Sequence, residues 1–514
     1  MVIPSTDGGG GQTAANDFTA QQRPVAVGSL SAKTTTGLAG LLLNTVVQKG
    51  LGFASQMMLA WFLTPEDFGL VGMAYTFSAF ATVLSAGSVK DVLVQRQEEL
   101  DDLVNPAFWL SVVMGLGSVC IMAICAPLSA RWYDNRTVAG LVLIMAAIAI
   151  PTAINVVPNA LLEIHMRFKA VTALSLLASI LLPLMTVGMA WAGGGAYSLV
   201  VPRLLLMVLV AGLAWKISGM RIKVAPEFRK WRSLIGSTTL VVLFGFVCSL
   251  IPQMDRIALG RFHGEKVLGL YFFAFGLSSQ IGSMLSVNLV TVLFPAISKL
   301  RDEPQRQVGA VLRASRCIAL VGIPLCLLQA AVARPSLYAI FPARWNDAAP
   351  ILTVLSFSLA CLLVVLPSHS LLRATGKFGT LLWIAAVQLV VMGAASFLAA
   401  WLGGPVAVAV ANAIVSLVFG VWFVLASLRP FGLGWHTMIG AYGRSVLIGL
   451  VVFAVAMGIC WPHFASRLAN LLQLCVAGGI GVCLHLFLAR QWMPGDWADL
   501  KARVGQLVNR GRTV

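Results

Sequence analysis

Residues 379–401, GTLLWIAAVQLVVMGAASFLAAW, run for 23 positions without a single charged side chain. A helix needs about 20 mostly apolar residues to cross the hydrocarbon core of a bilayer. Comparable stretches recur along the chain, and segments such as TPED at 64–67 and GGP at 403–405 supply turn-forming residues between them. The pattern predicts a series of membrane-spanning helices.

Composition supports the same class. The chain has 514 residues, of which 59% are apolar and only 11% are Asp, Glu, Lys or Arg. Soluble domains carry about 25% charged residues, and so few charges cannot cover a water-facing surface. A soluble enzyme, a disordered chain and a disulfide scaffold are therefore excluded. We expect an all-α polytopic membrane protein.

Fourteen spans are predicted from the apolar runs and the breaks between them. They cover 37–61, 68–89, 106–130, 137–159, 170–192, 195–218, 233–260, 268–291, 311–333, 348–372, 379–401, 404–428, 441–460 and 467–490.

The basic residues predict the orientation. With a cytoplasmic N-terminus, the cytoplasmic segments hold 26 of the 36 Lys and Arg residues, the outer loops hold 7, and 3 lie within spans. Basic residues collect on the cytoplasmic side of membrane proteins. Both termini are therefore expected in the cytoplasm, and the formal charge of +17 is attributed to topology rather than to nucleic-acid binding.

The predicted spans and the polar segments between them divide the chain into domains. They are a disordered cytosolic tail at 1–36, an N-lobe at 37–218, a basic linker at 219–232, a C-lobe at 233–428, spans 13 and 14 within 441–490, and an amphipathic cytosolic tail at 491–514. In the last segment Trp497, Leu500, Val504 and Leu507 follow helical spacing. This helix either lies on the anionic inner leaflet or packs on the protein.

The two halves resemble each other. Residues 59–78, shifted by 200, match 259–278 at six of twenty positions, including Leu59/Leu259 and Gly69/Gly269. Six spans separate the copies, so both halves point the same way, as in the parallel repeats of some transporters. The match predicts two lobes around a central cavity. Chance similarity between apolar segments is the alternative.

Polar side chains within span 1 are candidates for lining that cavity. Asn44, Gln48, Gly52 and Ser55 follow helical spacing, and Lys49 and Gln56 flank them. Such a stripe either lines a wet cavity or makes close helix contacts.

Ionisable residues inside spans are costly and mark functional candidates. Lys49 lies about 18 Å into span 1 at 1.5 Å per residue, a depth that indicates a cavity or an anion. Arg203, about 12 Å below the outer surface, either faces the cavity or snorkels, and Arg256, about 6 Å from the end of span 7, is better placed to snorkel. Asp255 either pairs across the lobe interface or caps the span. Three cations against one anion favour an anionic substrate group.

Catalytic motifs are missing from the sequence. It contains no GxxxxGK[ST] and no HExxH, and its short outer loops carry no paired carboxylates. The nine cysteines lie in or beside apolar segments without a CxxC. We therefore expect no enzyme activity, no cofactor and no metal site.

Several segments are similar to the polysaccharide transporter family of the multidrug/oligosaccharidyl-lipid/polysaccharide superfamily. They are LAWFLTPEDFGLVGMAYTF (59–77), LVQRQEEL (93–100), NPAFWLSV (105–112), MDRIALGRFHGEKVLGLYFFAFGL (254–277), LFPAISKLRDEPQR (293–306) and LYAIFPARWNDAAPIL (337–352). Asp255–Arg256 matches the family's "DR", and Lys49 lies where the family often carries a basic residue.

The resemblance implies a flippase of the bacterial inner membrane. Such proteins move undecaprenyl-diphosphate-linked oligosaccharide repeat units by alternating access, and the units feed exopolysaccharide, capsule or O-antigen assembly by polymerase and co-polymerase machinery. A small-molecule antiporter of the same superfamily and a lipid II flippase are alternatives. A membrane glycosyltransferase or polymerase is the alternative from another class.

Overall fold

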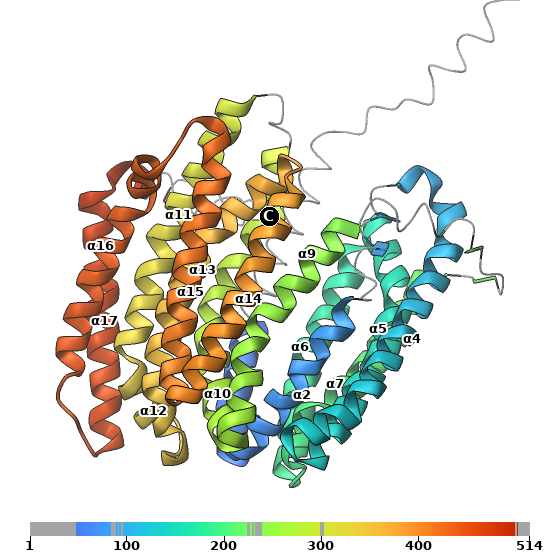
Figure 1. Ribbon diagram of the computed structural model, residues 1–514, viewed down its shortest axis with the longest axis horizontal. Helices are drawn as coiled ribbons and strands as arrows, with labels where there is room; N and C mark the ends of the chain where they lie inside the picture. The colour runs from blue at the N-terminus through green and yellow to red at the C-terminus, as the bar shows by residue number, and fades with distance from the viewer. Residues whose placement is uncertain are drawn as a thin grey trace, which may run out of the picture.

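The computed structural model describes residues 48–83, 89–90, 92–93, 96–220, 222–223, 227–228, 231, 239–298, 303–498 and 501. Over these residues the chain forms helices joined by turns (Figure 1). Eleven of the helices in this part of the chain are long and apolar enough to cross a membrane. The all-helical, multi-pass class predicted from the sequence is confirmed.

The N-lobe, as we use the term below, comprises the helices up to α7. They are a helix at residues 48–62, α2 (Pro65–Val83), η1 (Gln97–Glu99), α4 (Leu100–Tyr133), α5 (Arg136–Ile164), α6 (Phe168–Trp191), η2 (Gly195–Leu199) and α7 (Val201–Ser218). Local signals set their ends: the Asn135 side chain accepts from the Thr137 amide at 2.9 Å and caps α5. Gly219 ends α7 at a φ of 68°, which glycine adopts without steric cost.

The C-lobe comprises the helices from α9 to α15. They are α9 (Thr239–Leu250), η3 (Ile251–Gln253), α10 (Met254–Ser298), α11 (Pro304–Ala331), α12 (Ala333–Ile340), η4 (Ala343–Ala348), α13 (Ala349–Ala374), α14 (Phe378–Leu402) and α15 (Pro405–Leu428). Gly264, with a φ of 75°, interrupts α10. Residues before it continue the predicted span 7, and residues after it form the predicted span 8.

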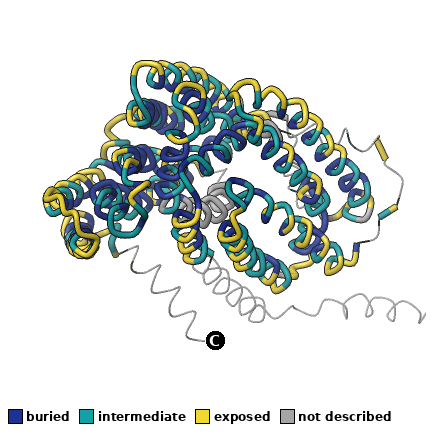
Figure 2. The backbone as a smooth tube through the Cα atoms, turned by 90° about the horizontal axis from the view of Figure 1, so that it is seen from below, coloured by how far each residue is buried: buried dark blue, intermediate teal, exposed yellow. Residues whose placement is uncertain are grey.

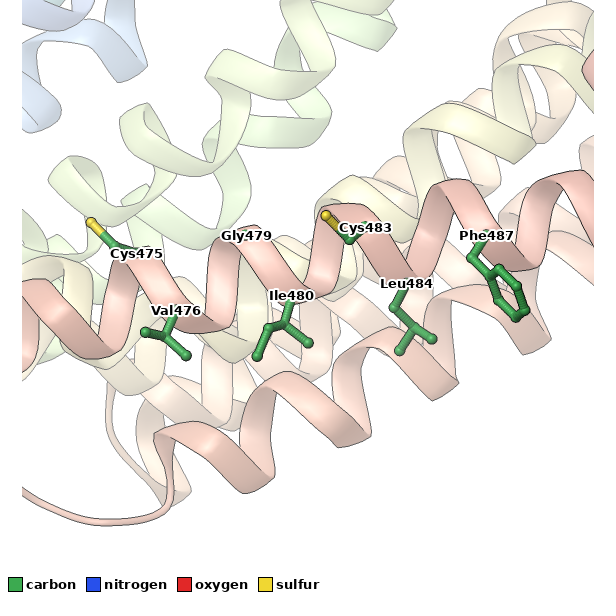
Figure 3. A pocket seen from close by; sticks show the side chains of 7 residues that line it. All are labelled: Cys475, Val476, Gly479, Ile480, Cys483, Leu484 and Phe487. Carbon is green, nitrogen blue, oxygen red and sulfur yellow. The ribbon is translucent and has the colours of Figure 1, made fainter.

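A terminal pair follows the short η5 (Arg429–Phe431) and consists of α16 (Trp435–Cys460) and α17 (Arg467–Trp492). Helix α16 packs against α11, and the pair forms one edge of the molecule (Figures 1 and 2). Seven residues from Cys475 to Phe487 line a shallow, almost wholly apolar groove along α17 (Figure 3).

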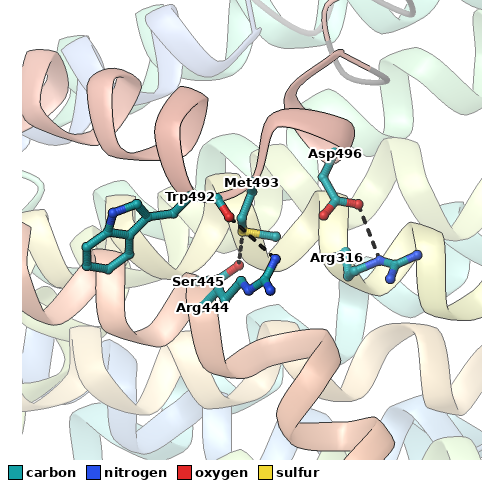
Figure 4. A network of polar contacts seen from close by, with 6 residues as sticks. All are labelled: Arg316, Arg444, Ser445, Trp492, Met493 and Asp496. Carbon is teal, nitrogen blue, oxygen red and sulfur yellow. Dashed lines mark hydrogen bonds and ion pairs between the residues drawn. The ribbon is translucent and has the colours of Figure 1, made fainter.

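The chain after α17 folds back onto its neighbours (Figure 4). The Arg316 Nε on α11 lies 3.3 Å from a carboxylate oxygen of Asp496, and Arg444 of α16 donates to the Trp492 carbonyl at 3.5 Å. Trp497 packs beside the buried cluster that includes Met493. The first turn of the predicted amphipathic tail therefore packs on the protein. Its other apolar positions, Leu500, Val504 and Leu507, lie outside the described residues.

The predicted spans compare closely with the helices. Spans 3 to 6 and 9 to 14 each coincide with one long helix, whereas spans 7 and 8 share α9 and α10. The start of span 1, the tail at 1–36 and most of the linker at 219–232 lie outside the described residues. The connection between the predicted spans 9 and 10, residues 334–347, contains two short helices, α12 and η4, which the apolar runs do not predict. Burial of Ala333, Leu337 and Trp345 explains why this segment is ordered.

The outer surface of the bundle is apolar, as a protein in lipid requires. Figure 2 shows exposed residues along the periphery and buried residues between the helices. Val390 is 71% exposed, Leu184 is 64% and Phe487 is 63%. The largest buried cluster contains residues of α2, α5, α10 and α13, and so it includes the contact between the lobes.

Candidate functional site at the seam between the lobes

The lobes meet along a seam formed by the helix at 48–62, α2, α10 and η4. The turn that begins α2 is fixed by its own sequence. Thr64 is the N-cap: its amide and hydroxyl donate to the Asp67 carboxylate at 2.9 and 3.0 Å, and the Asp67 amide donates back to the Thr64 hydroxyl at 3.3 Å. Pro65 occupies the first helical position, which needs no amide hydrogen. We refer to this end of the bundle as the Thr64 end.

Two glycines bring the helices into backbone contact. A Cβ added at Gly69 would overlap the carbonyl oxygen of Glu265, and one added at Gly269 would overlap the carbonyl oxygen of Pro65. The two contacts are related by the same shift of 200 that relates the sequence repeats. Only glycine allows this approach, and the reciprocal pairing is what a two-fold relation between the halves requires.

An aromatic cluster covers the same end of the seam. Phe68 packs against Phe273 and Trp345, with ring centroids 5.7 and 5.1 Å apart, and Phe273 lies 4.1 Å from Trp345. The Trp345 indole donates to the Ala60 carbonyl at 2.9 Å, and Arg344 donates to the same carbonyl at 3.0 Å. The C-lobe therefore satisfies the last carbonyls of an N-lobe helix, which that helix leaves unpaired.

The N-lobe makes a corresponding contact with the C-lobe. Tyr133 lies against Gly260, where an added Cβ would be 2.7 Å from the ring, and the Asn135 amide donates to the Glu265 carboxylate at 3.0 Å. The Thr64 end of the seam is thus held from both lobes by backbone contact, aromatic packing and hydrogen bonds.

Polar residues from both lobes meet further along the seam. The Gln280 amide donates to the Gln56 side chain at 3.3 Å. Gln56 also packs on Gly276, where an added Cβ would lie 2.9 Å from its amide nitrogen. Gln56, predicted to line the cavity, therefore lies at the lobe contact.

Arg203 and Arg256 approach one aromatic pair from opposite lobes. Arg203 is exposed and donates to the Tyr75 hydroxyl at 2.9 Å. Tyr75 lies 5.9 Å from Phe272, and the Arg256 guanidinium is 5.1 Å from the Phe272 ring. Arg256 is only 7% exposed, so it does not snorkel to the surface. An arginine held against aromatic faces stays charged and keeps its donors directed.

Asp255 is fully buried. Its carboxylate accepts from the Tyr271 hydroxyl at 2.5 Å, from the Asn412 amide at 3.3 Å and from the Arg256 backbone amide at 2.8 Å. Ser358 extends the network by donating to Asn412 at 2.6 Å. These partners belong to C-lobe helices, so the carboxylate caps the start of α10 and ties it to α13 and α15. Each removed partner would leave a buried polar group unsatisfied.

The other predicted residues lie elsewhere. Gln48 donates to Ser175 of α6 at 2.7 Å, which is a contact within the N-lobe. Lys49 follows Gln48 on the helix at 48–62 and is half-buried. Asn44 lies outside the described residues. The structure therefore brings Gln56, Arg203 and Arg256 to the seam.

Sequence reasoning missed Trp345, although a signal existed. Residues 130–132, at the end of α4, and residues 343–345, in η4, both read ARW, and each triplet lies at the break between equivalent predicted spans of the two halves. It also missed Tyr271 and Asn412, the partners of Asp255, because no local pattern marks a contact between residues 16 and 157 positions apart in the sequence.

The helical fold and the contacts of the seam define a class of protein, namely a two-lobed, multi-pass helical membrane protein whose lobes meet along a partly polar seam. Two comparisons of folds agree with that class. The chain superimposes on the lipid II flippase MurJ in an inward closed conformation with a TM-score of 0.70, 15% identity, and coverage of 89% of this chain and 98% of that one. An inward-facing multidrug resistance MATE family transporter gives a TM-score of 0.61 at 13% identity and covers 76% of this chain and all of that one.

The sequence comparison identifies the family. Residues 58–350 match the family described as polysaccharide biosynthesis protein, which is more than half of the chain, and so this chain belongs to that family. The resemblance stated from the sequence is confirmed.

Curated relatives carry related names. The succinoglycan biosynthesis transport protein ExoT of Rhizobium meliloti (strain 1021) is 25% identical over 90% of this chain and 93% of its own length. The teichuronic acid biosynthesis protein TuaB of Bacillus subtilis (strain 168) is 23% identical over 84% and 89%. The lipopolysaccharide biosynthesis protein WzxC of Escherichia coli (strain K12) is 23% identical over 64% and 67%.

Proposed function

We propose that this protein is a flippase that moves polyprenyl-diphosphate-linked oligosaccharide repeat units across the bacterial inner membrane. The units would supply exopolysaccharide, capsule or O-antigen synthesis, with polymerase and co-polymerase proteins as partners. The family supports this proposal, and so do the names of the relatives, which refer to succinoglycan transport and to teichuronic acid and lipopolysaccharide biosynthesis.

The observation that carries the proposal is the closed Thr64 end of the seam, where two backbones touch at Gly69 and Gly269. Alternating access of two lobes needs a contact at one end of the seam that can close and open. Closing and opening this end would expose the seam to one side of the membrane at a time.

The proposed topology has fourteen spans with both termini in the cytoplasm, and it retains the predicted domain boundaries. The excess of basic residues in the assigned cytoplasmic segments supports this orientation. The Thr64 end then faces the periplasm, and the substrate would enter from the inner leaflet.

Cationic groups would neutralise the diphosphate as it passes through the seam. We assign this role to Lys49, Arg203 and Arg256. Gln48, Gln56 and Asn44 would bind uncharged parts of the headgroup, while the polyprenyl tail stays in lipid. The location of Arg203 and Arg256 around Tyr75 and Phe272 supports a shared site. Asp255, buried beside Arg256, is the proposed coupling residue.

A deletion with complementation tests the function. The gene is deleted in its host and restored with wild type, Lys49→Ala, Lys49→Arg or Lys266→Ala, and surface polymer, lipid-linked repeat units and folded protein are measured. Lys266 is an exposed lysine at the Thr64 end and serves as the matched control. We expect deletion and Lys49→Ala to lose polymer and accumulate lipid-linked units, and Lys49→Arg to restore part of the export.

Unchanged polymer after deletion would refute the flippase. Elongation of a labelled acceptor by the purified protein would instead indicate a glycosyltransferase. Normal export by a folded Lys49→Ala protein would remove only Lys49 from the site.

A further inference from the structure

A pocket with a mixed polar and apolar lining lies at the Thr64 end, on the side of the C-lobe next to the terminal pair. It has a volume of about 530 Å³ and is formed by the end of α11, α12, η4, the first turn of α13 and the end of α16. Pockets of roughly 300–1,000 Å³ are typical of small-molecule sites. The pocket is separate from the glycine contacts of the seam, which involve α2 and α10.

Aromatic, polar and charged side chains line the pocket together. The aromatic residues are Tyr338 and Trp461, and the Arg334 guanidinium lies 5.1 Å from the Tyr338 ring. Trp461 is 76% exposed, so its ring is accessible to a ligand in the pocket. The planar polar side chains are Arg334, Asn346, Asp347 and His463.

Asn346 lines the pocket from η4, next to Asp347. Its side-chain oxygen is buried and has no hydrogen-bond partner within the described part of the chain, which is unfavourable for an acceptor. Turning the side chain toward the pocket would let a ligand hydroxyl supply the donor that this oxygen lacks.

We propose that this pocket binds a saccharide. A sugar ring presents apolar C–H faces, which pack on aromatic rings, and hydroxyl groups that each donate and accept hydrogen bonds. The pocket offers both kinds of surface, with Arg334 as donor, Asp347 as acceptor and the Asn346 amide as both. Opposite charges at Arg334 and Asp347 disfavour a site for a simple cation or a simple anion.

The position of η4 gives the pocket a link to the seam. Arg344 and Trp345 contact the N-lobe through the Ala60 carbonyl, whereas the next two residues, Asn346 and Asp347, line the pocket. A sugar held here would lie against the same single turn that holds the Thr64 end closed. This site goes beyond the proposed transport path because it binds sugar outside the seam, although the choice of ligand class rests in part on the proposed function.

Binding of free sugars to the full-length protein in detergent tests the proposal. The probes are glucose, galactose, N-acetylglucosamine, glucuronate and maltose, and the measurement is saturation-transfer NMR from protein to sugar protons. The variants are Trp461→Ala, Trp461→Phe and Asn346→Ala. Trp191→Ala is the matched control, because Trp191 is 77% exposed at the end of α6 in the N-lobe.

We expect at least one probe to bind wild type and the Trp191 variant equally. Trp461→Ala should weaken binding at least tenfold, Asn346→Ala about fivefold, and Trp461→Phe less than either, with all variants eluting as folded protein. The proposal is overturned if no probe binds wild type, or if the probes bind the Trp461 and Asn346 variants as well as wild type. Failure of the flippase proposal would look different: the protein would bind sugars, yet its deletion would leave surface polymer unchanged.

Discussion

The seam between the lobes and the attachment of the terminal pair both use glycines, but in different ways. At the seam, Gly69 and Gly269 meet backbone carbonyls, which cannot move aside. At the terminal pair, Gly449 and Gly481 meet the methyl ends of leucines on α11, where an added Cβ would lie 2.8 and 2.5 Å from a leucine Cδ1. A leucine tip can rotate into another staggered position, whereas a carbonyl held in a helix cannot.

The difference teaches where the molecule tolerates change. Two backbones in contact can accept an added methyl group only by moving apart. A glycine that faces a side-chain tip can accept one when that side chain adopts another staggered position, which disturbs the packing less. We therefore expect the moving element to be the seam, and the α16–α17 pair to travel with the C-lobe.

The largest effect is expected from Gly69→Ala and Gly269→Ala. Each methyl group would push α2 and α10 apart and open the Thr64 end, which overpacking of a rigid contact makes unfavourable by about 1–3 kcal/mol or more. Surface polymer in the complemented deletion strain should fall more than tenfold, with the protein still present in the membrane. The control is Gly309→Ala in α11, where nothing lies within 4 Å of an added Cβ. If both seam variants export normally, the seam is not the moving contact.

A smaller effect on export, with a clear effect on stability, is expected at Asp255. Asp255→Ala would leave Tyr271 and Asn412 without their acceptor, and breaking a buried polar cluster costs about 3–5 kcal/mol. Thermal unfolding of the purified protein should show this loss. Asp255→Asn keeps the shape and part of the hydrogen bonding, so it should fold. The folded Asp255→Asn protein should export less polymer than wild type, because the proposed coupling role requires the carboxylate, and normal export would assign Asp255 a purely structural role.

Trp345→Phe should have a moderate effect. The substitution keeps the ring packing against Phe68 and Phe273 but removes the indole donor to Ala60, at a cost of about 1 kcal/mol. Export should fall a few-fold. Trp132→Phe is the matched control, because Trp132 belongs to the other ARW triplet and is 46% exposed, and a phenylalanine ring can keep its contact with the Arg261 guanidinium, which lies 5.8 Å from the ring. Equal export by the two variants would show that the hydrogen bond does not hold the seam.

The smallest effect is expected at the terminal pair. Gly449→Ala and Gly481→Ala should change the unfolding temperature by only a few degrees and leave export within twofold of wild type, since leucine tips can yield and alanine favours helix by about 1 kcal/mol. A loss as large as that at Gly69 would erase the distinction between the two regions.

The long helices and one contact of the seam could be predicted from the sequence. Apolar runs predicted the long helices because a bilayer imposes a length and a composition on each of them. The repeat placed Gly69 and Gly269 at equivalent positions, and the structure brings them into reciprocal contact. That agreement arises because a two-fold relation converts sequence equivalence into spatial pairing.

Other parts could not be predicted from single helices. The rise per residue predicts how deep Arg203 and Arg256 lie in the membrane, but not which way their side chains point. In the structure Arg203 is exposed and Arg256 is buried. Asp255 was identified as unusual, but its partners Tyr271 and Asn412 come from residues 16 and 157 positions away. Helix α12 has eight residues, which are too few to cross a bilayer, so a search for apolar spans does not find it.

The reciprocal glycine contact also limits how the sequence of this chain can vary. Each half contributes one glycine and one carbonyl, and the glycine of one half fits the carbonyl of the other. A side chain at either glycine would have to be accommodated by the backbone of the other half. The two positions, 200 residues apart, are therefore restricted by each other as well as by their own helices.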